Sequence, residues 1–424
     1  MMKISNKKIK IAVVGLGYVG LPIAIELAKF FKVYGYDKKK KRVRDLLLNI
    51  DQTREIEPKV LKKTKVIFSD KEKILKNANV FIITIPTPVD KNNLPNLTLL
   101  RESTRTISKY IKKNSLIIYE STVYPGCTEE VCLPILKKNK KLEYNKDFFI
   151  GYSPERINPG DKKRNVSNIT KVISGSNSEA VEKIKYIYSK VVRSGIHVAP
   201  SIKIAEAAKI IENTQRDLNI GLMNELFMLF DKLNISTEEI LKAAGTKWNF
   251  LKFKPGLVGG HCIGVDPYYL TYKCKQINFK PKIILSGRNI NDNFHKFIGE
   301  KTLKIIKNQK LKKNILVLGY SFKENCPDYR NTRIFHLVKF LKSKNCEIKI
   351  HDPYLLENEN NFPFQRLALK NLKEYNRLFD LILLAVPHNF YLKNQSFLLK
   401  LLSKKGLIYD FKSSLKKNNK IIQN

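Results

Sequence analysis

The first part of the chain alternates short apolar runs with helical patterns. Runs rich in β-branched residues occupy residues 9–14, 33–36, 80–85 and 116–119. This alternation predicts a parallel sheet wrapped by helices. The last part repeats the plan, with predicted strands at residues 314–318, 347–350, 381–386 and 407–409. We therefore expect an α/β protein in which two similar domains bracket the chain.

The middle of the chain follows a different pattern. From about residue 202 to residue 308 the β pattern disappears, and apolar residues recur at helical spacing from Ile204 to Leu229. One domain cannot bury the whole apolar surface of so long a helix, so we expect the helix also to form a homodimer interface. The predicted parts are 1–201, 202–308 and 309–424.

A glycine-rich turn directly follows the first predicted strand. It reads Gly15-Leu16-Gly17-Tyr18-Val19-Gly20 and leads into a predicted helix. Such glycines allow a tight turn and a close approach of a pyrophosphate to backbone N–H groups, and the helix N-terminus favours negative charge. Asp37 ends the second predicted strand, where a carboxylate accepts hydrogen bonds from an adenosine ribose. We therefore expect NAD, while the basic run at residues 38–42 leaves NADP open.

A second glycine cluster, at residues 255–267, surrounds a cysteine. It reads PGLVGGHCIGVDP, and its thiol belongs to Cys262. A substrate can approach the backbone closely among glycines, whereas the other five cysteines stand in apolar or lysine-rich surroundings. Cys262 is therefore the candidate nucleophile. A buried structural thiol is the alternative interpretation.

Four further residues are candidates for the same chemistry. Lys209 and Asn213 lie four residues apart in a predicted helix and so share one face. A lysine and an amide together can donate hydrogen bonds to an oxyanion, although a solvated lysine is the common case. Thr122 and Glu155 follow predicted strand ends, where open α/β sheets bind their ligands.

Composition excludes several other classes of protein. No apolar stretch is long enough to cross a bilayer, so we expect no membrane insertion. The scattered cysteines form no CxxC pair, which predicts a reduced, cytoplasmic protein without a metal site. A net charge of +41 raises nucleic acid as a partner. Because lysines are spread along the whole chain with no RNA-binding aromatic signature or zinc finger, we expect no nucleic-acid function.

Six segments resemble, in order and spacing, the UDP-glucose/GDP-mannose dehydrogenase family. They read GLGYVGLP, ESTVYPG, GYSPERINPGD, KIIENTQRDLNIGLMNE, KPGLVGGHCIGVDPYYL and SFKENCPDYRNTR. The resemblance runs from about residue 9 to residue 412. In detail the chain is most similar to bacterial UDP-N-acetylglucosamine and UDP-N-acetylgalactosamine 6-dehydrogenases of surface-polysaccharide synthesis.

The resemblance implies two Rossmann-like, doubly wound domains joined by a long central helix that dimerises. It also implies the catalytic roles. Cys262 is the nucleophile, and Lys209 is the general base or oxyanion partner with Asn213 as its companion. Asp266 assists proton transfer at the thiol site. Thr122 and Glu155 order the hydrolytic water.

The resemblance further implies binding residues for NAD and for a UDP-sugar. The cofactor contacts come from Gly15, Gly17, Tyr18, Val19, Gly20, Asp37, Arg42, Thr87, Thr122 and Arg330. The substrate contacts come from Glu155, Arg156, Ile157, Asn158, Lys209, Asn213, Phe250, Leu251, Gly259 and Lys323. Lys323 faces the nucleotide phosphates, which explains why the last domain has Gly319 but lacks the full glycine fingerprint.

The implied reaction removes two hydrides from C6 of a UDP-N-acetylhexosamine, GlcNAc or GalNAc, for capsule or O-antigen synthesis. UDP-N-acetylmannosamine, UDP-glucose and GDP-mannose are alternatives. Val258-Gly259-Gly260-His261-Cys262 replaces the Gly-Phe-Gly-Gly-Ser-Cys of glucose-specific members, which argues against UDP-glucose. A catalytically silent NAD-binding protein is a further alternative, which Cys262, Lys209 and Asn213 together speak against. The arginine that some relatives lend across the dimer has no clear counterpart: Lys247, Arg288 or neither fills that role.

Overall fold

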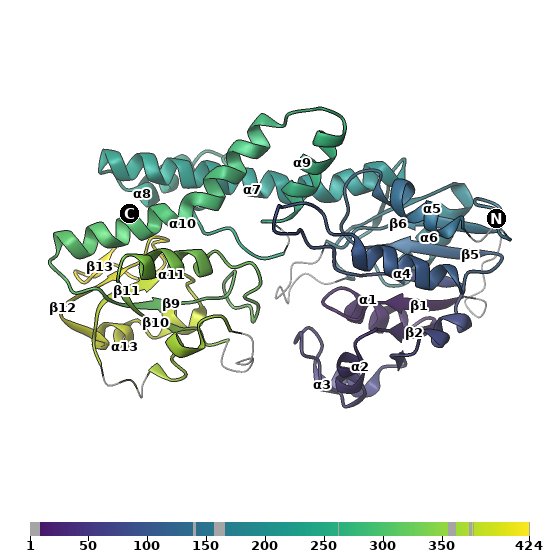
Figure 1. Cartoon of the computed structure of the whole chain (residues 1–424), viewed down its shortest axis with the longest axis horizontal. Helices are drawn as coiled ribbons and strands as arrows, with labels where there is room; N and C mark the ends of the chain where they lie inside the picture. The colour runs from purple at the N-terminus through teal and green to yellow at the C-terminus, as the bar shows by residue number, and fades with distance from the viewer. Residues whose placement is uncertain are drawn as a thin grey trace. The chain divides into compact units, whose positions relative to one another are not determined.

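The computed structural model describes residues 9–138, 141–156, 166–261, 263–354, 362–372, 375 and 377–423. The chain divides into two compact units, which are described separately below. The first unit comprises residues 1–212 and 268–279, and the second comprises residues 213–267 and 280–424. Figure 1 labels many of the helices and strands of both.

The first unit is built on a sheet that has eight strands among the described residues, in the order β3-β2-β1-β4-β5-β6-β7-β8. The strands are β1 (Lys10–Val14), β2 (Lys32–Tyr36), β3 (Ile67–Ser69), β4 (Val80–Ile83), β5 (Ser115–Tyr119), β6 (Phe148–Tyr152), β7 (Lys171–Gly175) and β8 (Ile196–Val198). All neighbouring pairs run parallel except β6 with β7. The order of β3 to β6 is that of a doubly wound dinucleotide-binding sheet.

Helices bury both faces of this sheet, which is why its central strands are apolar throughout. The helices are α1 (Gly20–Leu27), α2 (Lys40–Leu47), α3 (Pro58–Lys63), α4 (Thr98–Ser108), α5 (Leu133–Leu136) and α6 (Ser178–Ser189). Alternate residues of the strands, such as Val13 and Ile118, pack with Ile23 of α1 and Ile184 of α6 in one core. The residues between them, such as Ala12 and Ile117, are also fully buried and face the other way.

The second unit contains a parallel sheet of five strands within the described residues, in the order β10-β9-β11-β12-β13. The strands are β9 (Asn314–Leu318), β10 (Glu347–His351), β11 (Phe379–Leu384), β12 (Leu402–Tyr409) and β13 (Ile421–Ile422), and the short helices are α11 (Ile334–Ser343), α12 (Asn389–Lys393) and α13 (Gln395–Lys400). Separate apolar cores cover its two faces, one against α11 and one against α13. The predicted α/β class is confirmed, with one mainly parallel sheet and one parallel sheet.

Helices occupy the middle of the chain, as the apolar spacing predicts. They are α7 (Ile202–Leu233), α8 (Thr237–Ala244), α9 (Asp266–Gln276) and α10 (Lys282–Asn308). Of these, α7 and α10 are the long ones. In the second unit α7 and α10 lie side by side (Figure 1), and a Cβ added to Gly221 of α7 would lie 3.3 Å from the carbonyl oxygen of Gly287. No helix in the described part of the chain is both long and apolar enough to cross a membrane.

A buried polar network joins α7 to α10 beside this close approach. The Arg288 guanidinium is only 2% exposed and forms an ion pair with Asp217 at 2.5 Å. The Asn291 side chain donates to the Asp217 backbone and carboxylate oxygens, both at 2.8 Å. Because one charge of a buried pair is costly to leave alone, Arg288 is committed to its own chain. It is therefore a poor candidate for an arginine lent across a dimer.

Candidate active site

The glycine turn after β1 has the geometry that its sequence predicts. Gly15 adopts a φ of +94°, a region that favours glycine. A Cβ on Gly20 would lie 1.8 Å from the Gly15 carbonyl oxygen, so the helix can begin there only without a side chain. A Cβ on Gly17 would meet nothing within 4 Å. That open space beside the N-terminus of α1 fits a pyrophosphate, which the helix dipole and N–H groups favour.

Asp37 stands at the end of β2 and faces this turn. Its Oδ2 accepts a hydrogen bond from the Leu16 backbone N–H at 2.9 Å, and its Oδ1 accepts one from the Lys39 N–H at 2.9 Å. The carboxylate is partly exposed and keeps further lone pairs on both oxygens. The acid and the turn together therefore fit an adenosine ribose and its pyrophosphate.

Arg42 supports the turn from inside the protein. Its buried guanidinium donates from Nε to the Leu16 carbonyl at 2.7 Å and from Nη1 to Asp51 at 2.7 Å. These bonds give Arg42 a structural role that the sequence did not indicate. A direct contact between Arg42 and the cofactor stays a prediction.

Thr87 and Thr122 follow β4 and β5, which are neighbours in the sheet. The Thr87 hydroxyl donates to the Thr122 carbonyl at 2.5 Å. The hydroxyl of Tyr269, on α9, donates to the Thr87 carbonyl at 2.5 Å. The fold therefore brings together two residues that the sequence placed on separate loops.

The segment after Thr122 is fastened to α7 by Glu206. The buried Glu206 carboxylate accepts hydrogen bonds from the backbone N–H groups of Gly126 at 2.5 Å and Thr128 at 2.9 Å. Burial raises the pKa of Glu206 to about 7 although these hydrogen bonds oppose the shift. Gly126 has a φ of +94°, so this turn also requires glycine.

Glu206 should make the stability of the protein depend on pH. Its pKa is raised in the folded state above the ordinary 4.5, so the folded chain holds a proton that the unfolded chain releases. This contribution to stability is complete below about pH 4.5 and is lost as the pH rises through about 7. Relative to Glu206→Gln, we expect the free energy of unfolding of the wild type to fall by about 2 kcal/mol between about pH 5.5 and about pH 8. Urea denaturation of both proteins measures this, and a difference independent of pH would refute it.

A buried ammonium group lies behind Glu155. Lys171, the first residue of β7, places its Nζ 2.8 Å from Glu120 Oε2 and 3.9 Å from Glu155 Oε2. The Tyr188 hydroxyl donates to the other oxygen of Glu120. Burial raises the pKa of Glu120, and Lys171 opposes that shift. No local sequence pattern indicates that Lys171 serves Glu155, because the two are separated along the chain and meet only in the sheet.

Arg156 connects the same strand end to α7. Its Nε lies 2.8 Å from a carboxylate oxygen of Glu212, and its Nη1 donates to the Thr170 carbonyl at 2.8 Å. The predicted substrate residues Ile157 and Asn158 fall outside the described residues, as does Cys262.

Lys209 and Asn213 lie one turn apart on α7, as the spacing predicts. The Lys209 side chain is buried with 8% exposure, so it is not an ordinary solvated lysine. Asn213 is equally buried, and its Nδ2 donates to Asp266 Oδ2 at 2.5 Å. Asp266 begins α9. Two predicted catalytic residues, Asn213 and Asp266, are therefore in direct contact.

The glycine segment before Cys262 is held closely within the second unit. The Asn224 side chain accepts from the Gly256 N–H at 2.8 Å and donates to the Gly256 carbonyl at 3.0 Å. A Cβ on Gly259 would lie 2.9 Å from the Asn331 carbonyl oxygen, and a Cβ on Gly260, whose φ is +83°, would lie 2.6 Å from the Phe322 ring. Packing therefore requires glycine at positions 259 and 260.

Arg330 lies beside the same segment. Its guanidinium forms an ion pair with Asp328 at 2.6 Å and lies 3.1 Å from Nε2 of His261, the residue before Cys262. These contacts place Arg330 near the thiol segment within the second unit. Its predicted contact with the cofactor stays a prediction.

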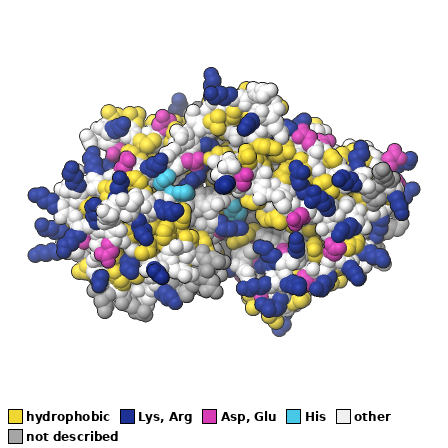
Figure 2. Space-filling view, viewed as in Figure 1, with side chains coloured by type: hydrophobic (Ala, Val, Ile, Leu, Met, Phe, Trp, Pro, Cys, Tyr) yellow, Lys and Arg dark blue, Asp and Glu magenta, His cyan; other side chains and the backbone are white. Residues whose placement is uncertain are grey.

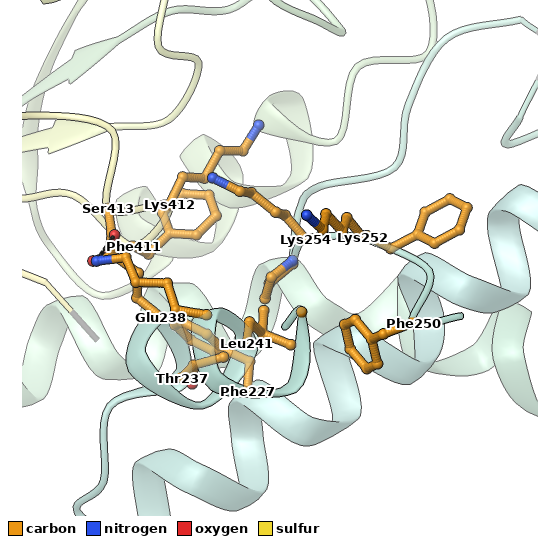
Figure 3. A pocket seen from close by; sticks show the side chains of 14 residues that line it. Phe227, Thr237, Glu238, Leu241, Phe250, Lys252, Lys254, Phe411, Lys412 and Ser413 are labelled. Carbon is orange, nitrogen blue, oxygen red and sulfur yellow. Dashed lines mark ion pairs between the residues drawn. The ribbon is translucent and has the colours of Figure 1, made fainter. Parts of the chain in front are cut away.

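A pocket of about 310 Å³ opens in the second unit (Figure 3). Its walls come from α7, α8, the segment at residues 250–255 and the segment that follows β12. The aromatic rings are those of Phe227, Phe250, Phe253 and Phe411, and the cations are Lys242, Lys252, Lys254 and Lys412. The buried Thr237 hydroxyl in its wall has no hydrogen-bond partner among the described residues. Apolar rings suit a flat, neutral base, and the nearby ammonium groups suit the negatively charged phosphates attached to it.

The comparisons with known proteins cover nearly the whole chain. Residues 9–192 match the NAD-binding domain of the UDP-glucose/GDP-mannose dehydrogenase family, residues 203–293 its central domain and residues 316–417 its UDP-binding domain. The chain belongs to this family. It is an oxidoreductase that uses NAD and oxidises a UDP-sugar.

Two curated proteins and one solved structure illustrate the likeness. Protein CapL of Staphylococcus aureus is 49% identical over 95% of both chains. The UDP-N-acetyl-D-glucosamine 6-dehydrogenase of Salmonella typhi is 46% identical over 90% of both chains. The structure of a UDP-D-ManNAc dehydrogenase from Pyrococcus horikoshii has a TM-score of 0.88, covers 98% of both chains and is 27% identical.

The family matches relate the pocket to the UDP-binding domain. Phe411 and Lys412, which line it, belong to the part that matches the UDP-binding domain. Phe250, predicted to bind substrate, also lines it, whereas the predicted Leu251 is exposed and is absent from its lining. Sequence reasoning missed Lys412, because a lysine in such a basic chain gives no signal of its own. Lys and Arg side chains are indeed spread over the visible surface (Figure 2).

Proposed function

We propose that the enzyme is a UDP-N-acetylhexosamine 6-dehydrogenase that makes a uronic acid through an acyl intermediate on Cys262. The observation that carries this proposal is the buried pair Lys209 and Asn213 on one turn of α7, with Asn213 fixed by Asp266. Desolvated donors of this kind stabilise an oxyanion far better than solvated ones. N-acetylglucosamine is the preferred sugar, supported by the 46% identical relative of that name.

The proposed reaction removes four electrons from C6 in two oxidations. When bound, NAD would supply the hydride acceptor for both oxidations, and the O6 proton leaves to water in each. After the first, the Cys262 thiolate adds to the aldehyde carbon and O6 takes a proton, which gives a thiohemiacetal. After the second, C6 is a thioester. Lys209 and Asn213 hold O6 throughout.

Water completes the reaction. Thr122 and Glu155 order a water molecule that attacks the thioester carbon, the C6–S bond breaks, and Cys262 leaves as the thiolate. Lys171 holds the Glu155 carboxylate in place for this step. Asp266, which is itself buried, assists proton transfer at the thiol.

The nucleotide occupies the pocket of the second unit. The uracil ring lies among the phenylalanines, and the diphosphate meets the lysines that line the pocket. Lys323 also faces the diphosphate, as the family resemblance implies. The family match to a UDP-binding domain at residues 316–417 supports this assignment. Arg330 and Arg42 serve the cofactor by direct contact or, as their present partners suggest, by fixing the segments beside it.

A panel of nucleotide sugars tests the substrate. We expect the highest kcat/KM with UDP-N-acetylglucosamine, then UDP-N-acetylgalactosamine, and lower values with UDP-N-acetylmannosamine, UDP-glucose and GDP-mannose. A preference for another sugar overturns the sugar assignment alone. No turnover of any of them would favour the silent NAD-binding protein.

The setting of the enzyme is part of the proposal. Its product serves capsule or O-antigen synthesis, which rests on the family resemblance. Cys127, Cys132, Cys274 and Cys346 are free thiols, which supports a reducing, cytoplasmic location. The division of labour at residues 1–201, 202–308 and 309–424 is supported by the three separate family matches.

We also propose that α7 forms a homodimer. Large apolar side chains remain exposed along this one helix, and they are Ile204, Ile211, Leu222, Leu229 and Leu233. A row of exposed apolar residues on a helix is typical of a surface that another chain covers.

Charge introduced on this row should separate the dimer. Leu222 is 50% exposed, so Leu222→Glu should leave the fold intact and raise the dimer dissociation constant at least about tenfold, because a carboxylate is costly to bury in an apolar interface. Sedimentation velocity measures the change. Leu47→Glu, at an exposed leucine of α2, is the matched control. Equal dissociation constants for both variants would contradict the assignment of α7.

A further inference from the structure

The second unit repeats the backbone geometry of the NAD turn. Gly319 follows β9 with a φ of +88°, as Gly15 follows β1 with a φ of +94°. The Gly319 N–H donates to the His351 carbonyl at 2.8 Å, as the Gly15 N–H donates to the Tyr36 carbonyl at 2.8 Å. The turn after the first strand is therefore the same in both sheets.

The aspartate that follows the neighbouring strand, β2 or β10, has different partners in the two sheets. Asp352 accepts from the Tyr320 N–H at 2.7 Å, as Asp37 accepts from the Leu16 N–H. The same Asp352 oxygen also accepts from the Ser321 N–H and hydroxyl, both at 2.8 Å. Asp352 is 3% exposed, whereas Asp37 is partly open to solvent. Asp352 is thus closed to a ribose and is committed to the loop.

His388 closes the other side of Asp352. The imidazole is fully buried just before α12, and its Nε2 lies 3.0 Å from Asp352 Oδ2. Its Nδ1 accepts from the Asn325 backbone N–H at 2.9 Å. A backbone N–H only donates, so Nδ1 carries no proton and Nε2–H is the donor to Asp352.

The loop from Tyr320 to Asn325 is therefore held at both ends. Asp352 fixes its beginning, and His388 fixes its end through Asn325, whose side-chain oxygen also accepts from the Asn389 N–H at 2.9 Å. Lys323 lies between these two anchors. Because both ends of the loop are held, the position of the Lys323 backbone is held as well.

The same loop also packs against the glycine segment that precedes Cys262. The Phe322 ring fills the space that a Cβ on Gly260 would need, and it meets the His261 ring edge to face at 5.8 Å between centroids. His261 precedes Cys262 in the chain. A shift of the loop would therefore move both Lys323 and the Phe322 ring that packs against the segment before Cys262.

We propose that His388 and Asp352 are positioning residues for the nucleotide. They fix the Tyr320–Asn325 loop and so set where the Lys323 ammonium meets the diphosphate of the UDP-sugar. This inference rests on the proposed function, in which Lys323 binds that diphosphate. It explains why the second sheet keeps the turn of a dinucleotide fold but has no open acid for a second dinucleotide.

Two substitutions separate the two hydrogen bonds of His388. Gln carries its amide nitrogen where Nε2 stands and so keeps a donor for Asp352, but it has no acceptor at the position of Nδ1. Asn carries its carbonyl oxygen at the position of Nδ1 and so keeps an acceptor for Asn325. Tyr391→Phe is the matched control, because its buried hydroxyl donates to the His351 carbonyl at 2.6 Å. The variant keeps the ring, which packs against His388 at 5.7 Å between centroids.

The experiment measures UDP binding by calorimetry and the steady-state constants of the whole enzyme. For His388→Gln we expect the Kd for UDP and the KM for the UDP-sugar to rise about fivefold, the size of one lost hydrogen bond. The KM for NAD and the kcat at saturating sugar should not change. His388→Asn should lie closer to the wild type, and Tyr391→Phe should leave both sugar constants unchanged.

Other results overturn the inference. Equal UDP affinity of the wild type and His388→Gln shows that the loop is not positioned by this residue. A lower kcat with unchanged KM, shared with Tyr391→Phe, reduces His388 to a general structural role, because partly misfolded enzyme lowers kcat alone. Failure of the wild type to bind UDP at all would instead refute the proposed function, and the inference with it.

Discussion

Cys262→Ala should form no uronate. Without the thiol no thioester can form, so steady-state production of the acid should fall at least about a thousandfold. NADH should stop at no more than one equivalent per sugar, since the second oxidation requires the sulfur adduct. Product analysis by chromatography, with NADH absorbance followed in parallel, measures both quantities.

The matched control is Cys346→Ala. Cys346 is buried in an apolar core of the second unit, and burial raises the pKa of its thiol, so it is a poor nucleophile. This variant should keep its kcat. Acid formation by Cys262→Ala at the rate of the wild type would exclude the covalent mechanism.

Lys209→Met should have the next largest effect. The buried ammonium is proposed to hold O6 in both oxidations, and loss of one oxyanion donor lowers kcat about 100- to 1,000-fold. The KM for the sugar should change much less, because the nucleotide supplies most of the binding. Initial rates over a range of UDP-N-acetylglucosamine concentrations separate the two constants.

Lys232→Met is the control for this substitution. Lys232 lies on the same helix but is exposed, so its removal should leave kcat within about twofold, as for an ordinary surface substitution. If Lys209→Met raised KM and left kcat intact, Lys209 would be a binding residue and not an oxyanion partner.

The sequence predicts those parts of the fold in which local pattern and tertiary structure agree. The turn at residues 15–20 lies where the strand and the helix predict it, and β9 occupies the predicted residues 314–318. The helix predicted from the apolar spacing after residue 202 is observed as α7. The strands β7 and β8 were not anticipated, since β7 runs antiparallel to β6 and so departs from a repeating strand–helix–strand order.

The candidate site was predictable only for residues that carry a local signature. Glycine spacing identified the turn of Gly15 and the surroundings of Cys262, and helical spacing identified Lys209 with Asn213. The contact of Asn213 with Asp266 joins positions 53 apart in the chain, which no local pattern reveals. The support of Glu155 by Lys171 and the pair His388–Asp352 arise in the same way, from strand ends that meet only in the folded sheet.

Arg42 and Arg330 show a different limit. Both were named as cofactor residues, and both have strong partners within the protein, in Asp51 and Asp328 respectively. An arginine beside a ligand turn can bind the ligand or hold the turn, and sequence spacing is the same in both cases. Only the observed partners reveal the second role.

The most direct test of the central claim is the number of NADH formed for each UDP-N-acetylglucosamine consumed. Limiting sugar is incubated with excess NAD and enzyme until the absorbance is constant, and the product is identified by mass. The account predicts two NADH per sugar and a UDP-linked uronic acid. One NADH per sugar with an aldehyde or ketone as the final product would contradict it.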